Sequence, residues 1–395
     1  MLDFNKLVDQ IKDVGSDSLK EQSEESSLLS AMSVLEEASS NPGAFDRRML
    51  EAGELVLWPV ARTLEPFGST YRTAEPPAGH TVVAVDGSQI MPSHHEVHSC
   101  YLLNVGLALV SYGVKQAPHL ESFPRLHHRP EDLYPLVDRR RIHIDELFVS
   151  LERTVYELEI LSYHSVLARE RGLPVVACFD GSLIPWSVEK MAPSYQDRFL
   201  DRFVNLIRQF SANDIPLLGY VSHSRSSDAV NMLRTFACPY DLPDCRSYCG
   251  HLNEEDFPCS KLWPLTDRAL FQTKLNKFER SNLFLSGARM STLLPRDVQV
   301  GFTYLNTGQE VARLEFPAFV TERRELLDLA LAAVRAQAVK GQGYPVTLAE
   351  AHHLAVIKAK DRERFFELMA RHLVGIGVNR VRTSPKERNK RMGFV

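Results

Sequence analysis

The chain has 395 residues, of which 44% are hydrophobic and 24% are charged, and its formal net charge at pH 7 is −4. These values are those of an ordinary globular protein, and the negative charge excludes a protein that coats nucleic acid over its whole surface, although a local basic strip can still follow a phosphate backbone. No apolar stretch reaches the roughly 18 residues of a membrane span, and the N-terminus lacks the pattern of a secretory signal, so we expect a cytoplasmic protein.

The first and last parts of the chain are expected to lie outside the main domain. Residues 1–75 have apolar positions at helical spacing and are predicted to form a helical region, in which Pro59 ends or bends the second helix. Residues 376–395 contain a basic run and are predicted to be a poorly ordered tail. A second basic strip is 139–141, and both strips are candidates either for phosphate contact or for a solvated surface.

The central region, residues 76–375, is predicted to form one α/β domain. Apolar runs bounded by turn residues indicate buried strands, and the longer stretches between them have helical spacing. The predicted strands are 81–85, one within 99–113, 173–179 and 215–221, and the predicted helices are 144–171 and 195–210. The first two strands can pair as a hairpin. Strands that alternate with helices after a hairpin are typical of a mixed sheet flanked by helices.

The tripeptide Asp-Gly-Ser occurs twice, each time after a predicted buried strand, as Asp86-Gly87-Ser88 and as Asp180-Gly181-Ser182. Each tripeptide alone is a common turn sequence. Ligands of α/β sheets bind beyond the carboxyl ends of strands, so aspartates on two neighbouring strands would converge there. Two adjacent carboxylates need a cation to stay ionised, and hard divalent cations prefer oxygen ligands. The repeat therefore predicts a Mn²⁺ or Mg²⁺ site for phosphoryl transfer.

A third carboxylate ligand is expected on the predicted helix 144–171. Glu157 and Glu159 are the candidates, and they lie about 200° apart around a helix, so at most one of them faces the site. The other must be an ordinary exposed glutamate. The sequence leaves the choice between them open.

A helix near the C-terminus carries a candidate histidine. Thr347 and Glu350 have the spacing of a capping box, which predicts that the helix starts there. His352 falls on the apolar stripe of this helix, where a histidine is more often a core residue than a ligand. Its position close to a helix start, where anions are favoured, also makes it a candidate for contact with a phosphate.

Four of the six cysteines occur in residues 238–262, a stretch without a clear period that we interpret as an inserted loop. These cysteines are Cys238, Cys245, Cys249 and Cys259. Structural zinc sites usually contain cysteine pairs spaced by two to four residues, and only Cys245 and Cys249 have such a spacing. Bound zinc, an iron–sulfur cluster and free thiols all remain open, with free thiols as the simplest interpretation.

The sequence from about residue 80 to residue 360 resembles the NurA family of DNA-end-processing nucleases. The markers occur in a fixed order along the chain: the two Asp-Gly-Ser segments, the acidic helix around Glu157 between them, the segment 313–317 (Arg-Leu-Glu-Phe-Pro), and Tyr344-Pro345 followed by His352. The cysteine-rich stretch is a departure from the best-known archaeal members of that family. Residues 1–75 have no match in it.

The resemblance implies a ribonuclease H-like core, a homodimer, and Mn²⁺-dependent 5′→3′ exonuclease and endonuclease activity on DNA during the processing of double-strand breaks. It implies a metal-binding set of Asp86, Asp180, His352 and one of the two glutamates, with Tyr344 close by. It also implies a hexameric ATPase partner of the HerA type, and the chain itself has no P-loop sequence. The alternatives are another phosphodiesterase that acts on RNA, and a non-catalytic scaffold that docks a motor ring.

Overall fold

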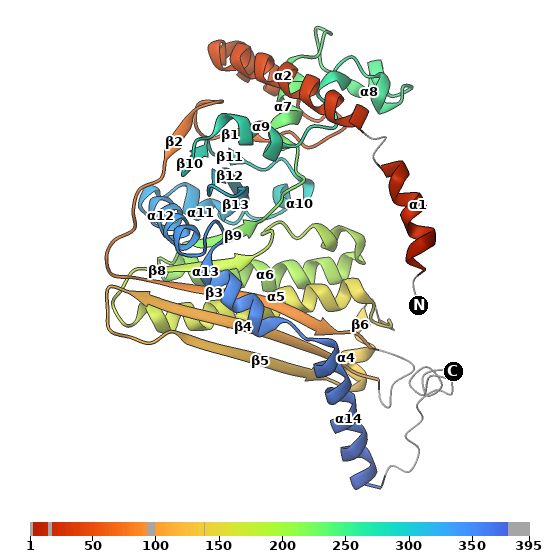
Figure 1. The fold of residues 1–395 in the computed structure, drawn as a ribbon, viewed down its shortest axis with the longest axis vertical. Coiled ribbons are helices and arrows are strands. Elements are labelled where there is room, and N and C mark those ends of the chain that lie inside the picture. Colours follow the sequence, from red (N-terminus) through yellow and green to blue (C-terminus); the bar gives the residue numbers. More distant parts are fainter. Residues whose placement is uncertain (1–2, 15–17, 93–98, 138, 378–395) are drawn as a thin grey trace. The chain divides into compact units, whose positions relative to one another are not determined.

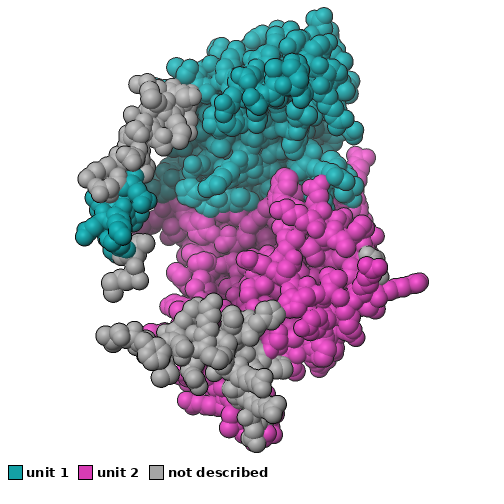
Figure 2. Space-filling view, turned by 90° about the vertical axis from the view of Figure 1, so that its right-hand side faces the viewer, with its two compact units in different colours: residues 1–73, 221–293, 299–315 teal, residues 74–220, 294–298, 316–395 magenta. Residues whose placement is uncertain are grey.

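The computed structural model describes residues 3–14, 18–92, 99–137 and 139–377. The chain divides into two compact units (Figure 2). The first unit consists of residues 1–73, 221–293 and 299–315, and the second of residues 74–220, 294–298 and 316–395. The predicted basic tail lies almost wholly outside the described residues. Within the described part of the chain, no helix combines the length and the apolar character that a membrane span requires.

Five strands of the second unit lie side by side in the order β5-β4-β3-β8-β9 (Figure 1). Their bounds are His80–Ile90 for β3, Tyr101–Tyr112 for β4, His119–His127 for β5, Val175–Asp180 for β8 and Leu217–Val221 for β9. The first three form an antiparallel meander, whereas β8 is parallel to β3 and β9 is parallel to β8. This is the strand order of a ribonuclease H-like core, so the predicted mixed α/β fold class is confirmed.

Helices cover both faces of these strands. In α5 (Glu146–Arg169), which packs on β3 and β8, Asp145 caps the first turn by accepting a hydrogen bond from the Phe148 backbone N–H (2.8 Å). In contrast, α13 (Val346–Ala355) packs on β3 and β4. Gly87 of β3 faces α5 while the next residue, Ser88, binds a carbonyl of α13. Because neighbouring strand residues point to opposite faces, α5 and α13 lie on opposite sides of β3.

The remaining elements of the second unit surround this core. They are α4 (Pro130–Leu133), β6 (Leu136–Val137), β7 (Arg140–Arg141), η2 (Trp186–Lys190), α6 (Pro193–Ala212), α11 (Ala318–Thr321), α12 (Arg324–Lys340) and α14 (Ala359–Gly375). Of these, α6 packs against α5, and an apolar stripe that includes Phe199, Phe203 and Ile207 forms its buried face. The basic strip 139–141 is exposed.

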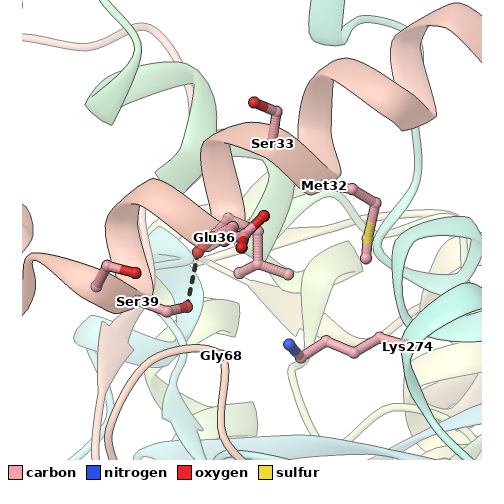
Figure 3. A pocket seen from close by; sticks show the side chains of 8 residues that line it. Met32, Ser33, Glu36, Ser39, Gly68 and Lys274 are labelled. Atoms are coloured by element: carbon pink, nitrogen blue, oxygen red, sulfur yellow. Dashed lines mark hydrogen bonds between the residues drawn. The ribbon is translucent and has the colours of Figure 1, made fainter.

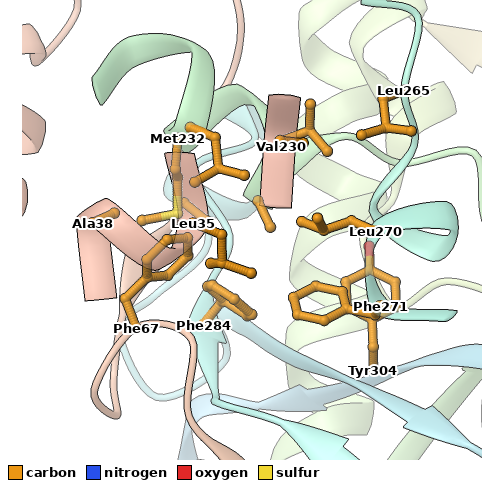
Figure 4. Packing of buried hydrophobic residues seen from close by; sticks show 14 of the residues in the cluster. Leu35, Ala38, Phe67, Val230, Met232, Leu265, Leu270, Phe271, Phe284 and Tyr304 are labelled. Carbon is orange, nitrogen blue, oxygen red and sulfur yellow. The ribbon is translucent and has the colours of Figure 1, made fainter. Parts of the chain in front are cut away.

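The first unit has an apolar core of its own. Its elements are α1 (Phe4–Val14), α2 (Ser18–Ser40), α3 (Pro42–Ala52), β1 (Arg62–Thr63), β2 (Thr70–Arg72), α7 (Asp228–Phe236), α8 (Cys245–Cys249), η3 (Glu254–Asp256), η4 (Ser260–Leu262), α9 (Asp267–Lys274), β10 (Glu279–Ser281), β11 (Phe284–Leu285), α10 (Arg289–Thr292), β12 (Val300–Asn306) and β13 (Val311–Pro317). In that core, Leu35 of α2 lies near the aromatic rings of Phe67 and Phe284, and Phe271 stacks on Tyr304 (Figure 4).

The structure corrects two local predictions and adds one strand. The helix expected to reach Pro59 ends at Ala52, because Gly53 follows with φ +42°, a backbone conformation that favours glycine. The C-terminal helix begins at Val346 rather than at a Thr347 cap, and the Thr347 N–H and hydroxyl both donate to Gln337 Oε1 (3.1 Å each). The edge strand β5 was not predicted.

Candidate metal centre

The two repeated aspartates lie on neighbouring parallel strands of the second unit. Val85 of β3 pairs with Phe179 of β8, so the next residue of each strand, Asp86 and Asp180, stand side by side. Asp180 is the last residue of β8, one residue beyond the end of the predicted strand 173–179. Asp86 does not follow its strand, as the sequence suggested, but lies within β3, because β4 continues to pair with β3 as far as Ile90. The parallel neighbour ends beside it, which leaves both carboxylates half-buried at one edge.

His352 of α13 completes a cluster with these two aspartates. Its Nδ1 lies 2.7 Å from Asp86 Oδ2, and one ligand atom from each of the three residues lies within 4.8 Å of the others. The sequence placed His352 on the buried stripe of its helix. The structure instead leaves 56% of its side chain exposed, beside that stripe, where the imidazole is open to solvent and to a ligand.

Glu157 and Glu159 of α5 occupy different environments. Glu157 is buried, with 3% of its surface exposed, and its carboxylate lies against Gly87, the residue after Asp86. Glu159 is half-buried and forms ion pairs with Arg125 (3.1 Å) and Arg202 (3.4 Å). Only Glu157 therefore lies next to the aspartate cluster, and Glu159 belongs to a separate network of charges along α5.

The two glycines of the repeat have different structural roles. A Cβ atom at Gly87 would lie 2.0 Å from Oε1 of Glu157, so this glycine makes room for the buried carboxylate. Gly181 has φ +130°, which an L side chain rarely adopts, and it turns the chain as β8 ends. The two serines are engaged within the fold: Ser88 donates to the Ala355 carbonyl, and Ser182 accepts from Ile184 N–H (3.1 Å).

Tyr344 contacts the cluster from the loop before α13. Its hydroxyl donates a hydrogen bond to Asp180 Oδ2 (3.2 Å), and its ring stands edge-on to Tyr220 of β9 with 5.2 Å between the centroids. Burial and the neighbouring Asp86 carboxylate raise the pKa of Asp180 to about 6, and the hydrogen bond from Tyr344 opposes this rise. Tyr344 is thus placed to hold the Asp180 carboxylate in one orientation and in its ionised form.

Too little positive charge lies near the Glu157 carboxylate to offset the cost of ionising it in a buried position. Burial raises its pKa to about 8, the nearby Arg153 opposes this, and the charges of Asp86 and Asp180 add to it. Arg153 forms an ion pair with Glu157 Oε1 (3.0 Å), yet this oxygen accepts no hydrogen bond of good geometry from any described residue. A divalent cation between the carboxylates would reduce the repulsion among their negative charges and bind the oxygen that lacks a hydrogen-bond partner. The donor set therefore fits Mn²⁺ or Mg²⁺.

Two residues that the sequence analysis missed support this cluster. Arg153 lies one helical turn before Glu157, a spacing that itself signals an ion pair on one face of α5. Asn104 is a polar residue within the apolar strand β4, and its side chain donates to the carbonyls of Leu354 (3.1 Å) and Ala355 (2.8 Å). These bonds fix the end of α13 and thereby the position of His352.

The other sequence markers lie in the first unit. Arg313 and Glu315 of β13 are buried and form an ion pair (2.7 Å), and Arg313 also pairs with Asp228 (2.8 Å). Such a closed group of buried charges contributes to the fold, because removing one partner would leave the others uncompensated. The four clustered cysteines also belong to this unit.

A surface pocket of about 590 Å³ is found in the first unit, where α2 faces the loop at Gly68 (Figure 3). Ser39 on its wall donates to the Leu35 carbonyl (2.6 Å). The charged residues that line it are one glutamate, Glu36, and one lysine, Lys274. It contains no convergent group of acids, and none of its lining residues belongs to the aspartate cluster, so its size alone does not make it the catalytic site.

The family model described as NurA domain matches residues 80–357. The crystal structure of the NurA nuclease from Sulfolobus solfataricus is 14% identical, covers 84% of this chain and 92% of that chain, and has a TM-score of 0.46. The catalytic domain of human endonuclease V is 13% identical over 82% of this chain and 97% of that chain, with a TM-score of 0.32.

A third solved structure is LC9-RNase H1, a type 1 RNase H, which is 9% identical over 39% of this chain and 69% of that chain, with a TM-score of 0.23. No curated protein matches the chain.

Proposed function

The chain belongs to the NurA family of nucleases, and we propose that it is a DNA nuclease that depends on Mn²⁺ or Mg²⁺. The observation that carries the proposal is the convergence of Asp86, Asp180 and His352, whose ligand atoms lie within 4.8 Å of one another. Glu157 lies beside them as a buried carboxylate. A set of oxygen ligands with one imidazole suits a divalent cation that acts on phosphate esters.

Each residue of the cluster has a role that follows from its contacts. Asp86, Asp180 and His352 would hold the cation, and Glu157 would add a fourth ligand or fix a neighbouring water. A bound divalent cation lowers the pKa of water and neutralises charge on phosphate oxygens. His352 is exposed, and an imidazole at this position is suited to accept or deliver a proton at the scissile phosphate. Tyr344 positions Asp180 through its hydroxyl.

The finer activity follows from the family resemblance. We propose 5′→3′ exonuclease and endonuclease action on DNA ends during the processing of double-strand breaks, by a homodimer that works in the cytoplasm with a HerA-type hexameric ATPase. The absence of a P-loop sequence is consistent with a separate motor. Co-purification of the chain with such an ATPase, and a change in degradation rate when ATP is added, would test this partnership.

The nuclease proposal is tested with the purified chain and end-labelled DNA, single-stranded and double-stranded, in Mn²⁺, Mg²⁺ or EDTA. Asp86→Asn and Asp180→Asn are assayed alongside, and each should lower the rate by several orders of magnitude, because each removes a negatively charged ligand without changing the size of the side chain. Degradation that persists in EDTA, or that survives both substitutions, would overturn the proposal.

Two alternatives predict other outcomes of the same assay. A phosphodiesterase specific for RNA would cleave labelled RNA and leave both DNA substrates intact. A non-catalytic scaffold would remain inert on DNA and RNA even when the motor ring is added, and calorimetry would detect no binding of Mn²⁺. Burial and mutual repulsion raise the pKa of Asp180 and Glu157, which makes both carboxylates costly to ionise without a cation. A scaffold that binds no cation has no use for such a group, so these carboxylates favour the nuclease.

A further inference from the structure

Four of the six cysteines gather in one segment of the first unit. This cysteine quartet consists of Cys238, Cys245, Cys249 and Cys259. Cys245 and Cys249 are the two ends of α8, so they lie one turn apart on the same side of that helix. Cys249 and Cys259 pack together in one small apolar cluster, Cys245 packs in another, and the indole of Trp58 contacts both clusters.

The sulfur atoms of the quartet share one space. Burial raises the pKa of the thiols of Cys245, Cys249 and Cys259, and the charge of the other cysteines raises it further. Each pair within the quartet interacts electrostatically, and the two apolar clusters that contain three of the four cysteines both pack against Trp58. None of them forms a disulfide, and three of the four side chains are buried. Four cysteines gathered in one place form the ligand set of a structural zinc site or of an iron–sulfur cluster.

A buried arginine faces the quartet. Arg234 is 4% exposed, and its guanidinium lies 3.9 Å above the Trp58 ring. One of its nitrogens forms an ion pair with Glu254 (3.1 Å), whereas Nε and Nη2 have no hydrogen-bond partner of good geometry among the described residues. The guanidinium lies beside the Cys259 thiol and opposes the rise in its pKa that burial causes. Unpaired N–H donors that face buried sulfurs are suited to thiolates, the form in which cysteine binds metals.

The spacing of the sulfurs distinguishes between metal centres. A single tetrahedral zinc ion with Zn–S bonds of about 2.3 Å would hold four sulfurs about 3.8 Å apart. Within the described residues, no group of three cysteines is arranged, as Asp86, Asp180 and His352 are, so that it could hold a single metal ion. A cubane of iron and sulfide separates its four cysteine ligands more widely, because the metal core itself lies between them. We propose that the cysteine quartet binds a four-iron, four-sulfide cluster.

The cluster would stabilise a segment that has little other support. Between Cys238 and Leu262 the regular structure is limited to a five-residue helix and two three-residue turns of 3-10 helix, and the apolar clusters that contain the quartet are small. The backbone at Cys238 is also fixed by Arg48, which donates to the Cys238 carbonyl (2.6 Å) and to the carbonyls of Tyr240 and Asp241. Small cores of this kind commonly depend on a metal for their folding energy.

The test is the metal content of the full chain purified without oxygen. About four irons and four acid-labile sulfides per chain are expected, with a broad visible absorption band that bleaches on reduction. Cys249→Ser should lose most of the iron and the band, while Cys100→Ala, a matched substitution of a buried cysteine outside the quartet, should retain both. If Cys249→Ser fails to fold, removal of iron from the native chain by a chelator and its anaerobic reconstitution with ferrous iron and sulfide provide the same comparison.

Two outcomes would overturn the proposal. One is a stoichiometric zinc ion without sulfide, which would identify the quartet as a zinc site. The other is a chain that carries no metal after anaerobic purification and takes up none on reconstitution, which would identify four free thiols. Neither outcome depends on nuclease activity, so the assay is independent of the proposed function of the aspartate cluster.

Discussion

Oε1 of Glu157 lies only 2.0 Å from the position that a Cβ atom on Gly87 would occupy, so the buried carboxylate of α5 fills the space of a missing side chain on β3. Gly87 is the residue after Asp86, and Asp180 lies on the adjacent strand. The glycine of the first Asp-Gly-Ser segment thus determines whether a carboxylate from α5 can lie beside the two aspartates. A single residue of β3 therefore controls how closely α5 can approach the aspartates.

Substitution Gly87→Ala should separate Glu157 from the aspartates. The methyl group would displace the carboxylate by an ångström or more, and such a displacement at a reacting centre costs about 100-fold in rate. Overpacking should also lower the free energy of unfolding by about 1–3 kcal/mol. Nuclease rate and thermal unfolding should be measured together, with Gly43→Ala, where a Cβ meets no atom within 4 Å, as the control. An unchanged rate in Gly87→Ala would show that Glu157 has no role in activity.

The paired substitutions Glu157→Gln and Glu159→Gln distinguish the two glutamates. Glu157→Gln should lower the nuclease rate roughly 100- to 1,000-fold, because it removes a buried negative charge beside the metal ligands. Glu159→Gln breaks only half-exposed ion pairs, which contribute up to about 1 kcal/mol to stability, and should change the rate less than a few-fold. Equal effects on the rate in both variants would contradict the assignment made from the structure.

The sequence predicted the buried strands well but misjudged where one of them ends. The apolar runs that form β3 and β8 are visible in the sequence, whereas Asp86-Gly87-Ser88 has the composition of a turn. The residues remain in β3 because the antiparallel neighbour β4 supplies hydrogen-bond partners as far as Ile90. How far a strand continues to pair with its neighbour is not encoded in the local pattern, so the turn-like composition predicted the wrong boundary.

Strand β5 and the choice of glutamate were hidden from the sequence for other physical reasons. The strand is mostly exposed, contains Pro124 and pairs with β4 alone, so it lacks the apolar alternation of a core strand. Helical spacing showed that Glu157 and Glu159 point in different directions, but only the packing of α5 on β3 determines which direction is buried. The residues of the cluster could be named from the sequence, and their mutual distances could not.

Affinity for the cation should rise with pH. Burial raises the pKa of Asp180 to about 6 and that of Glu157 to about 8, so the folded, metal-free chain holds more protons than the unfolded chain between about pH 4 and 8. Its free energy of unfolding should therefore fall as pH rises through this window, by up to about 1.4 kcal/mol per pH unit for each group. The cation displaces fewer protons at higher pH, so its stabilising effect should grow.

Thermal unfolding between pH 5 and pH 8, in EDTA and in excess Mn²⁺, measures both effects. The stabilisation by Mn²⁺ should be larger at pH 8 than at pH 5, and calorimetry in two buffers of different ionisation enthalpy should detect proton release on binding. In Glu157→Gln one titrating group is removed, so the dependence on pH should become shallower. A stabilisation that is the same at both pH values would contradict the position of these carboxylates around the cation.

Tyr344→Phe should shift the acidic limb of the pH–rate profile to higher pH. The Tyr344 hydroxyl donates to Asp180 Oδ2 (3.2 Å) and thereby opposes the rise in the pKa of Asp180. Loss of a hydrogen bond with a net contribution of about 1 kcal/mol corresponds to an upward shift of about 0.7 pH unit. The phenylalanine ring would keep its edge-on packing against Tyr220, so the fold should be retained.

Tyr163→Phe, at an exposed position of α5, is the matched control. If Tyr344 acts through Asp180, the rate at high pH should recover almost to that of the unmodified chain. A uniform loss of rate at every pH would show instead that the hydroxyl acts directly on the substrate.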